Sequence, residues 1–442
     1  MRTDVVIVGA GMTGLSVARS LEVEGLLLEK EPSVGGCLRT DQVDGYSIDR
    51  TGHLLHMQDP YVRKVMFEEL SLDWLQFERR AEIRLLDRTI PYPIQYNLHA
   101  LPRPERDRCV ADYLAVAGDV PPFESSFDQW SRTAYGDGLH ELFFSPYNRK
   151  LWQADLASMS AEWVKRFVPL PDRQLVLDGA RQPHASRTFG YNATFHYPLA
   201  GGTGAIVEEM AANLKLGVET EAALVSIDPV AKTCEFTNGM RIGYQKLVST
   251  IPLPRLLRLI HKVDQRVLEL SEGLRHNSVF YFAFGFRTGQ DIPDTHWIYV
   301  PEERFRIYRA GILSGYSPNV APRGCTLVCA EIGCSADDAS RMDPAMLRPQ
   351  VLEDLVGIGL VRPEWPLELE HHGAIDCAYV IFDEHRRKAL PEIQRYLQRL
   401  GIHSIGRYGA WDYGSMGDAL IEGRDCARLI NSELGQHRSS AH

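Results

Sequence analysis

The sequence has no long hydrophobic run and no block of like charges. No stretch approaches the ~20 consecutive apolar residues that cross a bilayer, so we expect no membrane insertion. No run of five like charges forms a tail, and 48 Lys and Arg stand against 58 Asp and Glu, a formal net charge of −10 over 442 residues. Nucleic acids and anionic membranes are bound by broad basic surfaces. The charge balance therefore argues against a general nucleic-acid binder.

Cysteine is also scarce: eight are too dilute for a disulfide framework, and none forms a Cys-x-x-Cys pair. We expect buried thiols in a cytoplasmic protein. His53 and His56 have a spacing of three, but no Cys or Glu nearby completes a zinc set, so we predict no metal site. The nucleophile elbow of hydrolases, the phosphate loop of nucleoside triphosphatases and the His-Glu-x-x-His zinc motif are missing.

The clearest pattern is an apolar strand, a glycine-rich turn, a helix and a second apolar strand within residues 5–28. Gly9 allows the tight turn, Gly11 lets the backbone approach a pyrophosphate, and Gly14 permits close packing of the helix on the strand. The helix N-terminus offers N–H groups to phosphates, and Glu29 is placed to bind ribose hydroxyls. The pattern predicts a dinucleotide site, with a βαβ turn that binds no nucleotide as the alternative.

A second glycine pair, followed by an arginine, favours FAD over a nicotinamide cofactor. This segment holds Gly36 and Arg39, shortly after the ribose carboxylate. Near the C-terminus, a glycine-bounded loop around Arg407 leads to Met416 and Asp418 at the start of an amphipathic helix. Such a loop is a second place for backbone contacts to the flavin.

The length predicts two or three domains, and the absence of a clear linker predicts that they interleave in sequence. The segment 98–192 is typical of helices, with Ser126 capping one helix and Ser160 heading another. After about Asn431 we expect an irregular, polar end. Strand patterns predict an antiparallel sheet built from residues 279–286, 297–300, 306–313 and 326–332.

Two arginines stand among aromatic residues. By strand alternation Arg309 shares a face with Phe305 and Ile307. If that face is buried, the guanidinium must meet an acid or an anionic ligand; if it is exposed, the guanidinium is solvated. Arg166 follows Trp163 by one helical turn, which suits either a phosphate ligand or an ordinary packing surface.

Several short segments, taken together, make the chain similar to one known family. They are Gly52-His53, Pro91-Tyr92-Pro93-Ile94-Gln95, Pro146-Tyr147-Asn148 with Trp152 and Arg166, Asn192-Ala193-Thr194-Phe195, Gly201-Gly202-Thr203-Gly204, Trp297-Ile298-Tyr299, Tyr308-Arg309, Tyr316-Ser317-Pro318 and Gly406-Arg407-Tyr408-Gly409. The chain resembles the UDP-galactopyranose mutase family, and its eukaryotic-type branch more than the bacterial one.

The resemblance implies an α/β fold with a Rossmann-like FAD-binding domain, a helical substrate-side domain and an antiparallel β-sheet domain. The expected boundaries are 1–77, 193–276 and 376–442 for the FAD-binding domain, 98–192 for the helical domain, and 78–97 with 277–375 for the sheet domain. It also implies that N5 of reduced FAD bonds to the anomeric carbon of a nucleotide sugar and displaces the nucleoside diphosphate, which returns to that carbon at the end. The sugar ring then opens and recloses through another hydroxyl, so pyranose and furanose interconvert without net redox.

Carried over residue by residue, the resemblance makes Arg166 and Arg309 the clamp on the pyrophosphate. It places His53 beside the flavin and Asn192 near the sugar. The other substrate positions are Tyr92, Gln95, Asn148 and Trp152 toward the nucleoside, Tyr299, Tyr316, Tyr379 and Tyr413 around the diphosphate, and Trp297. The expected cofactor positions are Gly9, Gly11, Gly14, Glu29, Gly36, Arg39, Gly52, Arg407, Met416 and Asp418.

The sequence departs from the family near the base, where His56 replaces an aromatic residue and Ile94 a phenylalanine. The nucleotide is therefore UDP or GDP, and the hexose, the oligomeric state and the choice of NADPH or NADH as reductant stay open; Arg79 lies about where a nicotinamide contact is expected. The alternative is a conventional FAD oxidoreductase of the amine oxidase or desaturase type, which gives the paired arginines no obvious task. A flavin-containing binding protein without turnover is a third reading.

Overall fold

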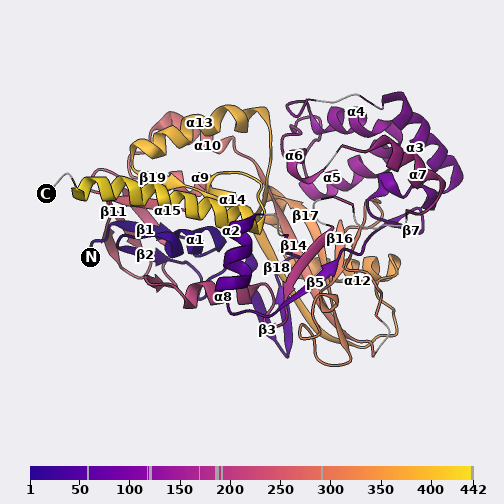
Figure 1. The fold of residues 1–442 in the computed structure, drawn as a ribbon, viewed down its shortest axis with the longest axis horizontal. Helices are drawn as coiled ribbons and strands as arrows, with labels where there is room; N and C mark the ends of the chain where they lie inside the picture. Colours follow the sequence, from indigo (N-terminus) through magenta and orange to yellow (C-terminus); the bar gives the residue numbers. More distant parts are fainter. Residues whose placement is uncertain are drawn as a thin grey trace.

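The structure is a computed structural model that describes residues 1–56, 59–116, 118, 122–168, 170–184, 189–190, 193–289 and 292–439. Figure 1 shows a parallel sheet with its helices on the side where both termini lie, a separate group of helices, and a large sheet beneath them. The expected α/β fold with mixed sheets and helices is confirmed. Over these residues, no helix is both long and apolar enough to cross a membrane.

The parallel sheet has the N-terminal strand at its centre. In spatial order its strands are β19 (Ile402–Ser404), β13 (Lys246–Ser249), β1 (Val5–Val8), β2 (Gly25–Leu28) and β9 (Gly217–Glu219). β1 is buried along its whole length, as expected of a strand covered on both faces. The predicted strand, turn, helix and strand of the first 28 residues are therefore confirmed.

Two helices from opposite ends of the chain pack together on this sheet, α1 (Met12–Ser20) and α15 (Met416–Ser439). The expectation of an irregular chain after about Asn431 is wrong. α15 continues to Ser439 because Ile430 and Leu434 are buried in the same apolar cluster as β1 and α1.

The helical group carries one wall of the cavity described below. Its helices are α3 (Arg103–Val116), α4 (Phe127–Leu139), the π-helix η5 (His140–Phe144), α5 (Ser145–Trp152), α6 (Val164–Phe167) and α7 (Arg173–Arg181). Ser126 caps α4 as predicted, because its Oγ accepts the N–H of Gln129 at 3.2 Å. The prediction that Ser160 heads a helix is wrong: Ser160 forms a β-bridge with Ser126, and α6 begins at Val164.

The large sheet has seven strands and is antiparallel except where β15 meets β6. In spatial order the strands are β18 (Leu367–Val380), β14 (His276–Arg287), β17 (Cys325–Ser335), β16 (Arg309–Ile312), β15 (Trp297–Tyr299), β6 (Ala81–Leu85) and β7 (Arg88–Pro91). All four predicted strands are present, although the one expected at 306–313 begins only at Arg309.

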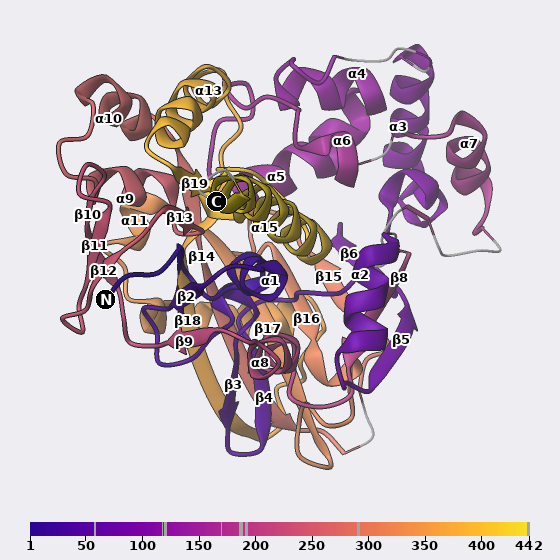
Figure 2. The ribbon, with the colours of Figure 1, turned by 60° about the vertical axis from the view of Figure 1, so that its left-hand side comes forward.

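The remaining elements connect or cover these three parts, and Figure 2 shows the hairpin β3–β4 beside the large sheet. The strands are β3 (Thr40–Val43), β4 (Tyr46–Asp49), β5 (Trp74–Glu78), β8 (Thr194–Pro198), β10 (Leu224–Asp228), β11 (Thr233–Phe236) and β12 (Arg241–Gly243). The helices are α2 (Pro60–Arg63), η2 (Lys64–Glu69), α8 (Gly204–Ala212), α9 (Leu253–Arg258), α10 (Gln265–Glu272), α11 (Ala336–Ala339), α12 (Arg348–Gly357), α13 (Glu384–Arg399) and α14 (Gly406–Gly409). Single 3-10 turns are η1 (Gly36–Leu38), η3 (Ile94–Tyr96), η4 (Leu98–Ala100), η6 (Leu313–Gly315) and η7 (Pro344–Leu347).

Candidate functional site

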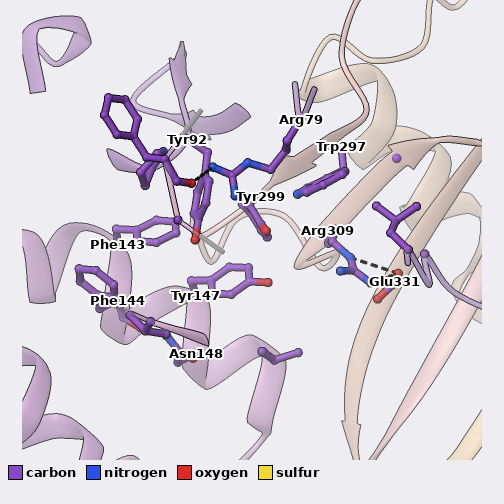
Figure 3. A pocket seen from close by; sticks show the side chains of 18 of the residues that line it. Arg79, Tyr92, Phe143, Phe144, Tyr147, Asn148, Trp297, Tyr299, Arg309 and Glu331 are labelled. Carbon is purple, nitrogen blue, oxygen red and sulfur yellow. Dashed lines mark hydrogen bonds and ion pairs between the residues drawn. The ribbon is translucent and has the colours of Figure 1, made fainter. Parts of the chain in front are cut away.

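A cavity of about 270 Å³ lies between the helical group and the large sheet (Figure 3). Aromatic side chains dominate its walls, with a few placed polar groups, which is typical of a small-molecule site. The predicted site residues that line it are Gly52, Tyr92, Gln95, Asn148, Trp297, Tyr299, Arg309, Tyr316 and Tyr413.

The sheet wall is built around Arg309 at the start of β16. Its Nη2 and Nε donate to Oε1 of Glu331 on β17, at 2.6 and 3.2 Å. The other Glu331 oxygen accepts a hydrogen bond from the Tyr308 hydroxyl. Burial alone would lower the pKa of Arg309, but the Glu331 carboxylate outweighs it and holds that pKa above the usual value. The side chain is therefore a permanent cation held in one orientation.

The structure corrects the predicted face of Arg309. Phe305 and Ile307 precede β16 and pack with Ala310 and Ile312 in one apolar cluster, so they lie on the opposite face from the guanidinium. The alternation argument failed because the strand begins at Arg309 rather than at residue 306. The sequence left open whether the Arg309 guanidinium is solvated or meets an acid. It meets an acid: the Arg309 side chain is 23% exposed, and that of its partner Glu331 is 5% exposed.

The helical wall comes from η5 and α5. Phe143, Phe144 and Tyr147 line the cavity, and the Tyr147 ring lies 5.3 Å from that of Tyr299 on the sheet wall. The Asn148 amide is used within its own helix: Nδ2 donates to the Phe144 carbonyl at 2.8 Å, and Oδ1 accepts the indole N–H of Trp152 at 3.1 Å. Asn148 thus fixes the wall as well as lining it.

Arg79 also reaches the cavity, from the turn between β5 and β6 (Figure 3). Its guanidinium carbon lies 4.8 Å from the ring centre of Tyr92, and Nη2 donates to the Phe189 carbonyl at 2.8 Å. The Tyr92 ring lies 4.9 Å from Tyr299. A second cation is therefore present beside the predicted nucleoside positions.

Two predicted substrate positions, Trp152 and Tyr379, are not part of the cavity wall among the residues described. Trp152 is buried against Tyr379, with ring centres 5.4 Å apart. Arg407 lies over the rings of Tyr379 and Tyr413, at 4.9 and 4.7 Å, and donates to the Ala378 carbonyl at 2.8 Å. This group joins the cavity to the segment that precedes α15.

His53 lies in the chain between Gly52 and Leu54, which both line the cavity, but is not itself among the lining residues. Burial, followed by the positive charge of Arg407, lowers the pKa of His53 to about 4, and Arg309 and Glu331 also act on it electrostatically. Its Nδ1 lies 3.1 Å from the Thr51 hydroxyl. The imidazole is therefore neutral near pH 7, able to donate one hydrogen bond and accept another.

The predicted dinucleotide cradle has the backbone shape that the motif requires. Gly9 has φ +98°, and a Cβ on Gly14 would lie 1.9 Å from the Gly9 carbonyl oxygen, so the helix can approach the turn only without a side chain. A Cβ on Gly36 would lie 3.3 Å from the Gly11 Cα, so the two glycine segments meet backbone to backbone. The residue at the N-terminal cap of α1 is Gly11, which has no side chain to cap the helix. These features fit a dinucleotide pyrophosphate.

The acidic and basic positions around the cradle are also in place. Glu29 is buried at the end of β2 and accepts the N–H of Ala10 at 2.7 Å, and Arg39 pairs with Glu31 at 3.3 Å. Met416 begins α15, and Asp418 accepts the N–H of Ser415 at 2.7 Å.

The side chains of two predicted site residues, Asn192 and Arg166, lie outside the described part of the structure. Asn192 lies outside the described residues, and Arg166 lies in α6 with its side chain outside the described part.

Sequence reasoning missed Glu331 and most of the aromatic wall. The signal for Glu331 was a single carboxylate in the apolar run 326–332, which a buried strand keeps only when the charge is paired. Phe143 and Phe144 gave no signal, because the helical period changes at η5. A π-helical turn of this kind occurs often at functional sites.

A buried histidine beneath the sheet wall makes stability depend on pH. Burial, and secondarily Arg80, lowers the pKa of His296 to about 4, while the unfolded chain titrates near 6.5. Between these values the unfolded state binds the proton and the folded state does not, so stability falls as pH drops from 6.5 toward 4, by about 3 kcal/mol for this residue. Urea unfolding at pH 7 and pH 4 measures the loss. His296→Asn keeps an acceptor for the Arg80 N–H and should reduce the loss by that amount; an equal loss in both proteins contradicts the assignment.

The sequence matches the family model described as flavin containing amine oxidoreductase over residues 12–431. Among curated proteins, coproporphyrinogen III oxidase of Bacillus subtilis (strain 168) is 22% identical over 377 residues, which cover 76% of this chain and 78% of that protein.

Two solved structures extend the comparison. A structure of reduced UDP-galactopyranose mutase is 27% identical, covers 99% of this chain and 94% of its own, and has a TM-score of 0.90. Wild-type putrescine oxidase bound to putrescine is 17% identical with a TM-score of 0.66, covering 98% of this chain and 99% of its own. The second likeness is one of fold alone.

Proposed function

Since the chain belongs to the family of flavin-containing amine oxidoreductases, we propose that it is a cytoplasmic flavin-dependent mutase that interconverts the pyranose and furanose forms of a nucleoside-diphosphate hexose. The observation that carries the proposal is the Arg309–Glu331 pair in the wall of an aromatic cavity. An apolar or amine substrate has no use for a fixed cation there, whereas a diphosphate does. The likeness to UDP-galactopyranose mutase supports the same reading.

Arg309 has one guanidinium edge held and one available. Glu331 takes Nε and Nη2, while Nη1 bonds no acceptor in the described part of the chain. The indole N–H of Trp297 likewise lacks an acceptor among the described residues. Both donors come from the sheet wall, so a diphosphate oxygen and a neighbouring hydroxyl of the substrate are the groups they would bind. Arg166 is the proposed second cation of the clamp.

The aromatic part of the cavity is the proposed nucleoside site. The Tyr299 ring lies 4.9 Å from that of Tyr92 and 5.3 Å from that of Tyr147, and these rings offer faces and edges to a flat base. Gln95 is buried in the same wall and supplies an amide that can donate and accept. UDP and GDP both satisfy this chemistry, and the eukaryotic-type branch of the mutase family is the one we propose.

The glycine cradle is the proposed FAD site, held by Gly9, Gly11, Gly14, Glu29 and Gly36. Reduced flavin, when bound, supplies the nitrogen nucleophile for the anomeric carbon of the sugar. The chain's own task is to orient the sugar, hold the leaving diphosphate at Arg309 for its return and keep His53 neutral. Asn192 is the proposed sugar contact, NADPH or NADH the proposed reductant, and the three domains have the boundaries given above.

Incubation of dithionite-reduced protein with UDP-galactose, and separately with GDP-hexoses, tests the proposal. We expect a product of unchanged mass whose sugar is a furanose, and none with oxidised protein. Turnover with a change of mass, or no turnover with any of these substrates, contradicts it.

The second candidate is a conventional FAD oxidoreductase, favoured by the family description and by the Bacillus subtilis oxidase. It predicts oxygen consumption with an amine or a porphyrinogen as substrate. The same protein preparation distinguishes the two, because the mutase reaction consumes no oxygen.

A further inference from the structure

A partly buried lysine joins the two walls of the cavity. Lys150 lies on α5, the helix that carries Tyr147 into the cavity, and its Nζ donates to the carbonyls of Val300 at 2.7 Å and Glu302 at 3.1 Å. Val300 directly follows Tyr299. The loop 300–308 returns to Arg309, so its two ends carry the main sheet-wall residues (Figure 3).

This lysine is not there for a salt bridge. No carboxylate of the described residues lies within 4 Å of the Lys150 Nζ. The nearby Glu302 carboxylate pairs with Arg304 instead, at 3.1 Å. The Asp354 carboxylate binds the N–H groups of Arg306 at 2.6 Å and Ile307 at 3.1 Å. Loop 300–308 is therefore bound to α12 through Asp354 and to α5 through Lys150, in addition to the backbone hydrogen bonds at its ends, where the Tyr308 N–H donates to the Glu331 carbonyl at 3.0 Å.

The position costs free energy, which an exposed lysine would avoid. Burial lowers the pKa of Lys150 to about 7, although Asp354, Glu302 and Glu303 act to raise it. Those three carboxylates are the titratable groups that act on it from α12 and the loop. A cation kept in such a place needs a geometric reason.

The backbone supplies that reason, since α5 touches the large sheet directly at its C-terminal end. A Cβ on Gly333 of β17 would lie 2.1 Å from the Lys150 carbonyl oxygen, and Asn277 of β14 donates to the Leu151 carbonyl at 2.5 Å. One turn earlier the same helix faces the cavity with Tyr147. Lys150 lies at this docked end of α5, so its amine ties loop 300–308 to the part of the helix that is itself fixed on the sheet.

We propose that Lys150 is a positioning residue that fixes loop 300–308, and with it Tyr299 and Arg309, against α5, and so sets the affinity of the cavity for a nucleoside diphosphate. The ligand class rests on the proposed function; the mechanical role does not. Without the amine, the loop keeps its contacts to Asp354 and to the strands of its own sheet. It loses the two hydrogen bonds that tie it to α5, the helix of Tyr147.

Lys150→Met tests the inference. Methionine has a similar volume but carries no charge, so the variant loses the two hydrogen bonds without leaving an unpaired cation in the wall. We expect the Kd for UDP, or for GDP if that is the better ligand, to rise at least ~10-fold by titration calorimetry, with the flavin spectrum unchanged and kcat at saturating substrate within about threefold. Lys150→Arg keeps donors for both carbonyls and should restore most of the affinity. Arg149→Ala, an exposed position on the same helix, should change nothing.

Hydrogen exchange of the amides in 300–308, measured without nucleotide, separates this inference from the proposed function. Faster exchange in Lys150→Met and slow exchange in Lys150→Arg support it. Unchanged exchange, or faster exchange with unchanged nucleotide affinity, overturns it. If the wild-type protein binds neither nucleotide while exchange still responds to Lys150→Met, the proposed function fails and the role of Lys150 in holding the loop stands.

Discussion

Replacing Arg309 by alanine is expected to lower the rate of sugar interconversion at least ~10²-fold while the flavin remains bound. The guanidinium is the fixed cation of the sheet wall, and a charge-assisted contact to a departing and returning diphosphate is lost with it. The loss should appear in kcat/KM measured with the reduced enzyme, and flavin absorbance reports retention of the cofactor. A rate within threefold of wild type contradicts the mutase proposal.

Two further variants separate the charge of Arg309 from its orientation. Arg309→Lys keeps the charge but not the planar fork that Glu331 holds at Nε and Nη2, so it should recover only part of the rate. Glu331→Gln keeps the shape but weakens the hold on Arg309, and should lower kcat/KM less than Arg309→Ala does. If Glu331→Gln is the more damaging variant, the carboxylate itself touches the substrate and the assignment of roles is wrong.

The parts of the fold that follow from local pattern could be predicted from the sequence. The turn at Gly9 and the packing at Gly14 depend on residues within one short segment, and so does the cap at Ser126. The site was placed mainly by resemblance, and the structure brings Tyr92, Tyr299 and Arg309 to one cavity from separate segments.

What could not be predicted depends on pairing between distant strands and on changes of helical period. Glu331 is opposite Arg309 only through the register of β16 on β17, which a single sequence does not specify. The face of Arg309 was predicted wrongly because side chains alternate between faces only within a strand. The strand was expected to begin at residue 306, but it begins three residues later. Trp152 lies on the same helix as Tyr147, but a helical period does not tell which of the two faces the cavity and which the core.

Gly14→Ala is expected to abolish retention of FAD and to lower the free energy of unfolding by several kcal/mol, although it adds a single methyl group. That methyl would lie 1.9 Å from the Gly9 carbonyl oxygen, which is backbone and cannot rotate away, so α1 must move off β1 and the turn that receives the pyrophosphate must open. The purified variant should be colourless, and thermal unfolding should occur at a lower temperature than for wild-type protein stripped of flavin. Gly435→Ala is the matched control, because Gly435 is also a helical glycine. Among the described residues, no atom outside the backbone of its own helix lies within 4 Å of the added Cβ. The higher helix propensity of alanine should therefore leave stability equal or raised by up to about 1 kcal/mol. A Gly14→Ala protein that keeps its yellow colour and its stability would mean that the close approach of α1 to the turn is not what forms the cofactor site.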